Sequence, residues 1–332
     1  MSGVVRIGIS GWTYAPWRGV FYPNDLPQNQ ELAYAARRFP AIEVNGTFYR
    51  LQTPQAFANW REQTPKDFVF AIKGSRYITH RLRLKDVKAP LANFFASGVL
   101  RLGPKLGPLL WQFPPQMKFD AGRFETFFAL LPGDTRQASA LARAHAARLD
   151  KGDWLESDVE QPIRHAVEIR HESFRDPAFI RLIRRFNIAL VCADTVEWPL
   201  LMDITADFVY CRLHGSEQLY VSGYGKGALA RWARRIQAWA EGGEPDDAAR
   251  VLPPAKPRAR GRDVYVFFDN DAKVRAPVDA AALMKRLRLE WIGGEGVEAR
   301  TRRRVKSTPI NRPKGGKAVS ASAKPSLRSR RG

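Results

Sequence analysis

The fold of this chain is decided by short apolar runs that end in charged residues, as in His165-Ala166-Val167-Glu168-Ile169-Arg170-His171. Side chains alternate between the two faces of a strand, so Glu168 and Arg170 share one face at the carboxyl end of this run. The same pattern recurs in Phe208-Val209-Tyr210-Cys211-Arg212-Leu213-His214-Gly215, where Arg212 and His214 share a face. Runs of this kind indicate buried strands with a polar site at one edge of the sheet.

Eight such runs occur along the chain, and helical spacing separates most of them. The segment after the sixth run is shorter and less helical. Apolar strands that alternate with helices indicate parallel pairing, and eight units over about 290 residues predict an α/β fold, a (β/α)8 TIM-like barrel. An open doubly wound sheet is the weaker alternative, because no Gly-x-Gly-x-x-Gly or Walker-type loop follows any run. The predicted strands are Val4–Ile9, Ala41–Phe48, Phe68–Ile72, Pro108–Phe113, His165–Ile169, Ile188–Ala193, Phe208–Leu213 and Val264–Phe268.

The chain is strongly basic, and the excess charge is concentrated at its end. The 332 residues include 54 Lys or Arg against 33 Asp or Glu, a net charge of +21, and residues 300–332 contain no acidic residue. We expect the barrel to occupy residues 1–292, with insertions at about 134–161 and 242–262. Residues 293–332 have too few apolar side chains to offset the entropy of ordering, so they are predicted to form a disordered basic tail.

The cysteine content and the hydropathy pattern exclude two classes of protein. Cys192 and Cys211 are the only cysteines, which excludes a disulfide framework and a Cys-based zinc finger. No apolar stretch approaches the roughly 20 residues of a membrane-spanning helix, and the N-terminus has no signal-peptide pattern. We therefore expect no membrane partner and a cytoplasmic location.

Polar residues lie near the carboxyl end of every predicted strand, where barrels of this type carry their functional groups. Glu43 and Glu168 are the candidate acid and base carboxylates, and His214 is a candidate proton shuttle near neutral pH. Lys73, Arg170 and Arg212 are candidate clamps for a phosphate or carboxylate. The other candidate ligand-binding residues are Trp12, Tyr14, Asn45, Tyr49, His80, Gln112, Asp194 and Asn270.

The same charges also admit a purely structural interpretation, because buried charges require partners. The carboxylates of Glu43, Glu168 and Asp194 balance the cations of Lys73, Arg170 and Arg212 one for one. That the polar groups lie near the same end of each strand favours a ligand site. A metal site built from these carboxylates and His214 is the weaker interpretation, because no short-spaced motif such as His-Glu-x-x-His is present. We therefore assign no metal ligand, and the cofactor is left unassigned.

Several motifs resemble the YecE-like family, the domain of unknown function 72, and together they extend in order from residue 3 to about residue 290. The resemblance implies a TIM-like barrel with a candidate site at its mouth. It implies no reaction, because no activity is established for the family. The family pattern implies two adjacent Asn after the eighth strand, where this chain has Asp269-Asn270-Asp271. The motifs that carry the resemblance include Gly8–Tyr14, Glu43–Arg50, Leu109–Pro115, Val167–His171 and Arg212–Gly215.

Three functions remain open at this level. The first is binding of, or catalysis on, a small molecule with a phosphate or carboxylate. The second is binding or processing of nucleic acid by the barrel mouth and the basic tail, because aromatic side chains stack on bases and basic tails bind phosphates. The third is a non-catalytic interaction protein whose strand-end charges neutralise one another. The oligomeric state is left unassigned.

Overall fold

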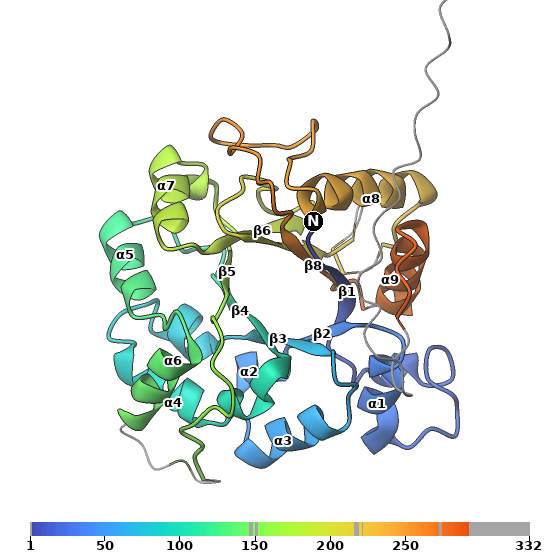
Figure 1. The fold of residues 1–332 in the computed structure, drawn as a ribbon, viewed down its shortest axis with the longest axis horizontal. Helices are drawn as coiled ribbons and strands as arrows, with labels where there is room; N and C mark the ends of the chain where they lie inside the picture. The colour runs from blue at the N-terminus through green and yellow to red at the C-terminus, as the bar shows by residue number, and fades with distance from the viewer. Residues whose placement is uncertain are drawn as a thin grey trace, which may run out of the picture.

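The computed structural model describes residues 2–145, 149, 152–215, 219–220, 222–271 and 274–291. Eight parallel strands pair in chain order and close into a barrel, β1 against β8, with the helices around them (Figure 1). The predicted (β/α)8 barrel is therefore confirmed, whereas the predicted tail, residues 293–332, lies outside the described residues. The strands are β1 (Val5–Ser10), β2 (Ala41–Val44), β3 (Val69–Lys73), β4 (Leu106–Gln112), β5 (His165–Glu168), β6 (Ala189–Asp194), β7 (Phe208–Leu213) and β8 (Asp263–Phe268).

The helices are α1 (Glu31–Ala36), α2 (Gly46–Tyr49), α3 (Pro54–Glu62), α4 (Lys88–Ala96), α5 (Ala121–Ala129), α6 (Thr135–Arg143), α7 (Pro177–Arg185), α8 (Lys226–Ala240) and α9 (Arg275–Arg286), with shorter helical turns η1 (Ala15–Trp17), η2 (Gln28–Gln30), η3 (Tyr77–Arg81), η4 (Val99–Lys105) and η5 (Glu172–Phe174). Helices α3, α5, α6 and α7 begin at residues whose side chains cap them. Thr53 accepts a hydrogen bond from the Ala56 amide at 3.1 Å, and Asp176 accepts one from the Ala178 amide at 2.7 Å. A proline follows each of these two caps, where its missing N–H costs nothing.

The two faces of the strands pack in two different apolar clusters. Ala71, Ala166 and Ala193 belong to the cluster inside the barrel, whereas their neighbours Ile72 and Val167 pack in the larger cluster beneath the helices. The small residues of β3, β5 and β6 share the interior with large side chains of β7 and β8 such as Tyr210 and Phe267, because an eight-stranded barrel is only wide enough to be filled by side chains. At the carboxyl end of the strands, the inward rows continue with polar residues, and these form the floor of the site.

Two segments differ from the sequence prediction or refine it. The second strand was predicted to reach Phe48, but β2 ends at Val44 and residues 46–49 form α2. The Thr47 hydroxyl lies 3.0 Å from the Val44 carbonyl oxygen and 2.7 Å from that of Lys73, so it turns the chain across the barrel mouth. The predicted insertion at 134–161 contains α6, which packs against α4. Residues 242–262 contain neither helix nor strand.

No helix in the described part of the chain is long and apolar enough to cross a membrane.

Candidate functional site

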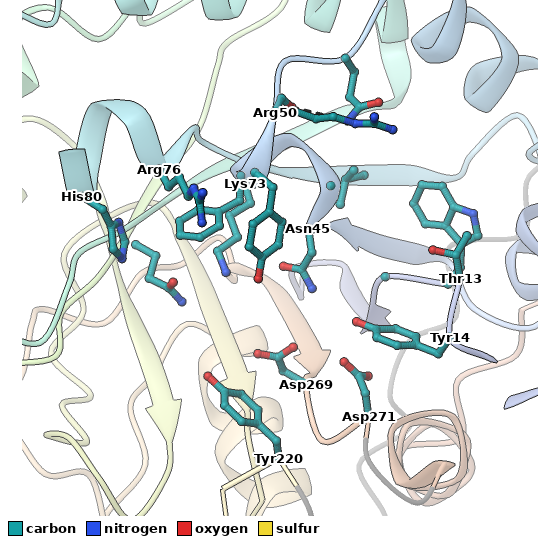
Figure 2. A pocket seen from close by; sticks show the side chains of 18 of the residues that line it. Thr13, Tyr14, Asn45, Arg50, Lys73, Arg76, His80, Tyr220, Asp269 and Asp271 are labelled. Carbon is teal, nitrogen blue, oxygen red and sulfur yellow. Dashed lines mark hydrogen bonds between the residues drawn. The ribbon is translucent and has the colours of Figure 1, made fainter. Parts of the chain in front are cut away.

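A pocket of about 1020 Å³ lies at the carboxyl ends of the strands (Figure 2). The loops after β1, β2 and β3 form much of its wall, and the ends of β4, β5 and β8 contribute further side chains. Eight of the residues predicted as ligand-binding line this pocket: Trp12, Tyr14, Asn45, Tyr49, Lys73, His80, Gln112 and Arg170.

A buried ion network centred on Arg212 lies beneath the pocket. The Arg212 guanidinium is 2.8 Å from the Glu43 carboxylate, 2.5 Å from that of Glu168 and 2.6 Å from that of Asp269. The Arg212 and both glutamate side chains are inaccessible to solvent. A buried charge network therefore exists, but it is not the predicted one-for-one balance, because Asp269 takes the place of Asp194 and Lys73 forms no ion pair with the described residues.

Both candidate acid/base glutamates are fully engaged in this network. Glu43 accepts hydrogen bonds from the Ser10 and Tyr210 hydroxyls, at 2.9 and 2.6 Å, besides those from Arg212. Glu168 accepts hydrogen bonds from Gln112 and Arg170, both at 2.8 Å.

Burial alone raises the pKa of Glu168, but Arg212 and Arg170 outweigh this effect and hold the pKa well below its ordinary value. The geometry thus makes Glu43 and Glu168 supports of the floor rather than bases that face the pocket.

The candidate proton shuttle His214 is also fully buried. Its Nδ1 lies 3.1 Å from the Asp269 carboxylate and its Nε2 lies 3.4 Å from the Arg212 guanidinium. The rings of Trp198 and Tyr220 pack against it edge to face, at centroid distances of 5.6 and 5.5 Å. His214 therefore lies next to the site without lining the pocket.

Two predicted ligand-binding residues point away from the pocket. Asp194 accepts a hydrogen bond from the Trp232 indole of α8 at 2.8 Å, and the Asn270 amide donates to Asp279 of α9 at 2.8 Å. The strand period explains both errors. Inward positions on β6 have odd numbers up to Ala193, as they do on β8, so even-numbered residues face the helices. Applied strictly, this alternation would have selected Asp269 and Asp271 from the sequence.

Lys73 is a buried cation in the floor of the pocket, and it takes no part in the ion network of Arg212. Its side-chain nitrogen has no hydrogen bond or ion pair with any residue that the structure describes, and it lies 4.4 Å from the centre of the Phe48 ring. Burial, reinforced by the positive charge of Arg212, lowers the pKa of Lys73 to about 8. The amine faces the pocket (Figure 2).

Further cationic side chains surround Lys73 on one wall of the pocket. Arg170 stacks its guanidinium 4.0 Å from the Trp198 ring while bonded to Glu168, and Arg76 extends from the loop after β3. Burial and the nearby charges of Arg170 and Lys73 lower the pKa of His80 to about 4. The imidazole is therefore neutral at physiological pH, and the arginines and Lys73 supply the positive charge.

The opposite wall carries the two aspartates that follow β8 (Figure 2). Arg212 outweighs the burial of Asp269 and lowers its pKa to about 2, so this group is ionised. Burial and the adjacent charge of Asp269 raise the pKa of Asp271 well above its ordinary value. Its Oδ1 atom is buried without a hydrogen-bond partner among the described residues. The wall thus pairs an ionised carboxylate with one whose surroundings favour the protonated form.

Comparison with known proteins identifies the family. The sequence pattern of the family described as "Protein of unknown function DUF72" matches residues 6–301. The chain belongs to the DUF72 family. Segments of it resemble the UPF0759 protein YecE of Escherichia coli K12, with 30% identity over 111 residues, and the UPF0759 protein YunF of Bacillus subtilis 168, with 27% identity over 117 residues. These segments cover 33% and 34% of this chain but only 38% and 40% of the two relatives.

Solved structures of DUF72 proteins share the fold. A DUF72 family protein from Thermotoga maritima superimposes with a TM-score of 0.63 at 23% identity, over 86% of this chain and 99% of that protein. One from Enterococcus faecalis V583 gives a TM-score of 0.61 at 16% identity, over 89% and 99% of the two chains. At these identities the likeness extends to the DUF72 barrel and not to its chemistry.

Proposed function

We propose that this DUF72 barrel binds, and acts on, a small molecule that carries a phosphate or a carboxylate. The observation that carries the proposal is the unpartnered Lys73 nitrogen in the pocket floor. The Lys73 side chain is largely buried, and its nitrogen faces the pocket without a partner among the described residues, a costly position for a charged group. Every carboxylate of the network beneath it is already bonded to Arg212. An anionic ligand would supply the missing partner.

The pocket wall supports the same proposal. Arg76 and Arg170 line the same pocket as Lys73. The planar guanidinium group of Arg76 suits the two-oxygen geometry of phosphates and carboxylates, whereas Arg170 adds positive charge while its Nε and one terminal nitrogen bond Glu168. The pocket of about 1020 Å³ is large enough for a metabolite. The aromatic rings of Trp12 and Trp60, which meet edge to face at 5.4 Å, would contact the apolar part of such a ligand.

The proposal is tested with three probes that share one carbon skeleton: glycerol 3-phosphate, glycerate and neutral glycerol. We expect the two anions to raise the thermal unfolding midpoint and glycerol to leave it unchanged. The Lys73→Met variant should lose this response, whereas Lys105→Met, which removes a buried lysine from another place, should keep it. Equal responses of the wild type and Lys73→Met, or none to either anion, would refute the proposal.

Nucleic acid is the second candidate ligand, and one observation at the rim favours it. Tyr49 is 66% exposed, and the Arg76 guanidinium lies 5.5 Å from its ring centre, an arrangement that suits stacking on a base. Salt-dependent titrations of the full chain with single-stranded DNA and RNA separate this candidate from the first. If the rim contributes, Tyr49→Ala weakens binding by about 1–3 kcal/mol; if only the tail binds, the variant matches the wild type.

The predicted cytoplasmic location and the alternative of a non-catalytic interaction protein stay predictions. A protein of that third kind would respond to none of the probes above.

A further inference from the structure

We propose that the Lys73 side-chain nitrogen is a nucleophile that condenses with the carbonyl group of an anionic aldehyde or ketone to form an imine. This inference rests on the proposed function, because it requires an anionic ligand in this pocket. The positive charge of Lys73 would attract that ligand, and in the covalent step Arg76 and Arg170 would face its anionic group while the neutral form of Lys73 meets its carbonyl group. It deepens that function by naming the substrate class and the first covalent step.

The position of Lys73 on the barrel supports this role. It is the last residue of β3, so the rigid sheet holds its backbone while the side chain faces the pocket. Its nitrogen has no acceptor among the described residues, so no existing bond must break before it reacts. The Phe48 ring covers one side of the nitrogen at 4.4 Å.

The surroundings of Lys73 also favour the neutral amine, the form that attacks a carbonyl. Two effects are known to activate lysine nucleophiles: removal of water and a neighbouring positive charge. Both operate here, through burial and through Arg212, and they lower the pKa of Lys73 to about 8. At pH 7 roughly a tenth of the side chain is then uncharged, against less than a thousandth for an ordinary lysine.

The step balances without an oxidant or a reductant. The neutral nitrogen donates its electron pair to the carbonyl carbon, and a proton moves from nitrogen to the carbonyl oxygen to give a carbinolamine. A second proton reaches this hydroxyl group, the carbon–oxygen bond breaks, and water leaves as the carbon–nitrogen double bond forms. The product is the protonated imine, which keeps the remaining proton on nitrogen, and the acid is left as its conjugate base. Asp271 lines the same pocket, where burial and the adjacent charge of Asp269 raise its pKa and so favour its protonated form; we therefore assign it as the acid that would supply the second proton.

The inference is tested with pyridoxal 5′-phosphate, a probe that combines an aldehyde with a phosphate. The full-length chain is incubated with one equivalent of the probe, any imine is reduced with borohydride, and the modified lysine is located by peptide mass spectrometry. We expect one pyridoxyl group per chain, on Lys73. Pyridoxal without the phosphate should label about tenfold more slowly, because it lacks the charge-assisted contacts to the arginines.

Two variants make the result specific. Lys73→Arg keeps the positive charge but cannot form the imine, so it should lose the label and still be stabilised by glycerol 3-phosphate. Lys105→Met should be labelled like the wild type. Circular dichroism and thermal unfolding establish that each variant is folded.

The outcomes separate the inference from the proposed function. Stabilisation by glycerol 3-phosphate without a label on Lys73 would overturn the inference and leave the proposed function standing. Labelling of Lys73 at equal rates by pyridoxal and its phosphate would overturn the anionic substrate class. Labelling of Lys73 that glycerol 3-phosphate slows by competition would support both.

Discussion

Lys73 at the barrel mouth and Lys105 at the end of η4 are buried to the same extent, and yet their nitrogen atoms have opposite surroundings. Each residue is 7% exposed, and burial lowers the pKa of each to about 8. The Lys105 nitrogen donates to the Arg61 carbonyl at 2.5 Å and to the Thr64 carbonyl and hydroxyl at 2.6 and 3.1 Å. The Lys73 nitrogen makes no such bond with the described residues.

This difference distinguishes a structural cation from one that is available to a ligand. Lys105 ties α3 to η4, and its bonds offset part of the cost of burying the charge. Lys73 bears that cost without any bond in return, which natural proteins tolerate mainly at functional sites. The two lysines have the same exposure and the same pKa, so these quantities do not distinguish their roles. Their hydrogen-bond partners do.

The largest loss of stability is expected when Arg212 is replaced, because its guanidinium pairs with three carboxylates. Arg212→Met leaves Glu43, Glu168 and Asp269 without their common counter-ion, so the free energy of unfolding should fall by about 3–5 kcal/mol. Urea denaturation measures this change. Arg185→Met is the matched control, because it breaks an exposed ion pair with Glu125 and should cost less than about 1 kcal/mol. Similar losses in the two variants would contradict the central role of Arg212.

A smaller loss of stability is expected at Lys105. Lys105→Met removes a donor from two carbonyl oxygens and a hydroxyl, and leaving such acceptors unsatisfied costs about 1–3 kcal/mol. The free energy of unfolding from urea denaturation should fall by that amount, with no change in labelling at the barrel mouth. A stability equal to that of the wild type would show that these bonds contribute nothing and would remove the contrast between the two lysines.

Replacement of Lys73 is expected to change the free energy of unfolding in the opposite direction. Lys73→Met breaks no bond and removes a buried charge, so stability at pH 7 should stay the same or rise by about 1 kcal/mol. The size of this stability difference depends on pH. The pKa of Lys73 is about 8 in the folded chain against 10.5 for an ordinary lysine, so unfolding takes up a proton between these values and wild-type stability rises with pH there. The rise should be smaller in Lys73→Met, because Lys105 alone still contributes. A loss of more than about 1 kcal/mol at pH 7 would assign Lys73 a structural role.

The finest test compares the reactivity of the two amines. Trinitrobenzene sulfonate attacks neutral amines, so its rate at Lys73 should rise with pH and level off above about 8. The positive charge of Arg212 lowers the pKa of Lys73 and so favours its neutral form. The negative charges of Asp269, Glu43 and Glu168 act in the opposite direction. Lys105 should react more slowly throughout, because its nitrogen is held by three acceptors. Peptide mapping of quenched samples gives both rates, and equal rates would remove the contrast in availability.

Much of the fold could be predicted from the sequence because its signals are local. The eight apolar runs, the Thr53-Pro54 and Asp176-Pro177 caps and the intervening helical spacing act over a few residues each. The second strand was predicted four residues too long, because Thr47 and Phe48 are typical strand residues. Their helical turn depends on the bond of Thr47 to the Lys73 carbonyl, which lies on another strand.

The candidate site could be predicted only in part. The sequence placed polar groups near the end of every strand, and eight of the eleven predicted ligand-binding residues line the pocket. It could not rank them by depth, so the buried supports Glu43, Glu168 and His214 were taken for the reactive groups. The depth of a side chain in a barrel depends on the stagger between strands, and no single strand encodes that stagger.

By itself, the sequence determined the barrel, the end of the barrel that carries charge, and the residues that can share a strand face, because these follow from periodicity along one strand. Only the tertiary structure decided which cations find a partner. Lys73, Arg170 and Arg212 look alike in the sequence, but Arg212 meets the carboxylates of Glu43, Glu168 and Asp269, whereas Lys73 meets none in the part of the chain that the structure describes. Pairing of buried charges depends on distances between segments far apart in the chain, and those distances are set only when the barrel closes.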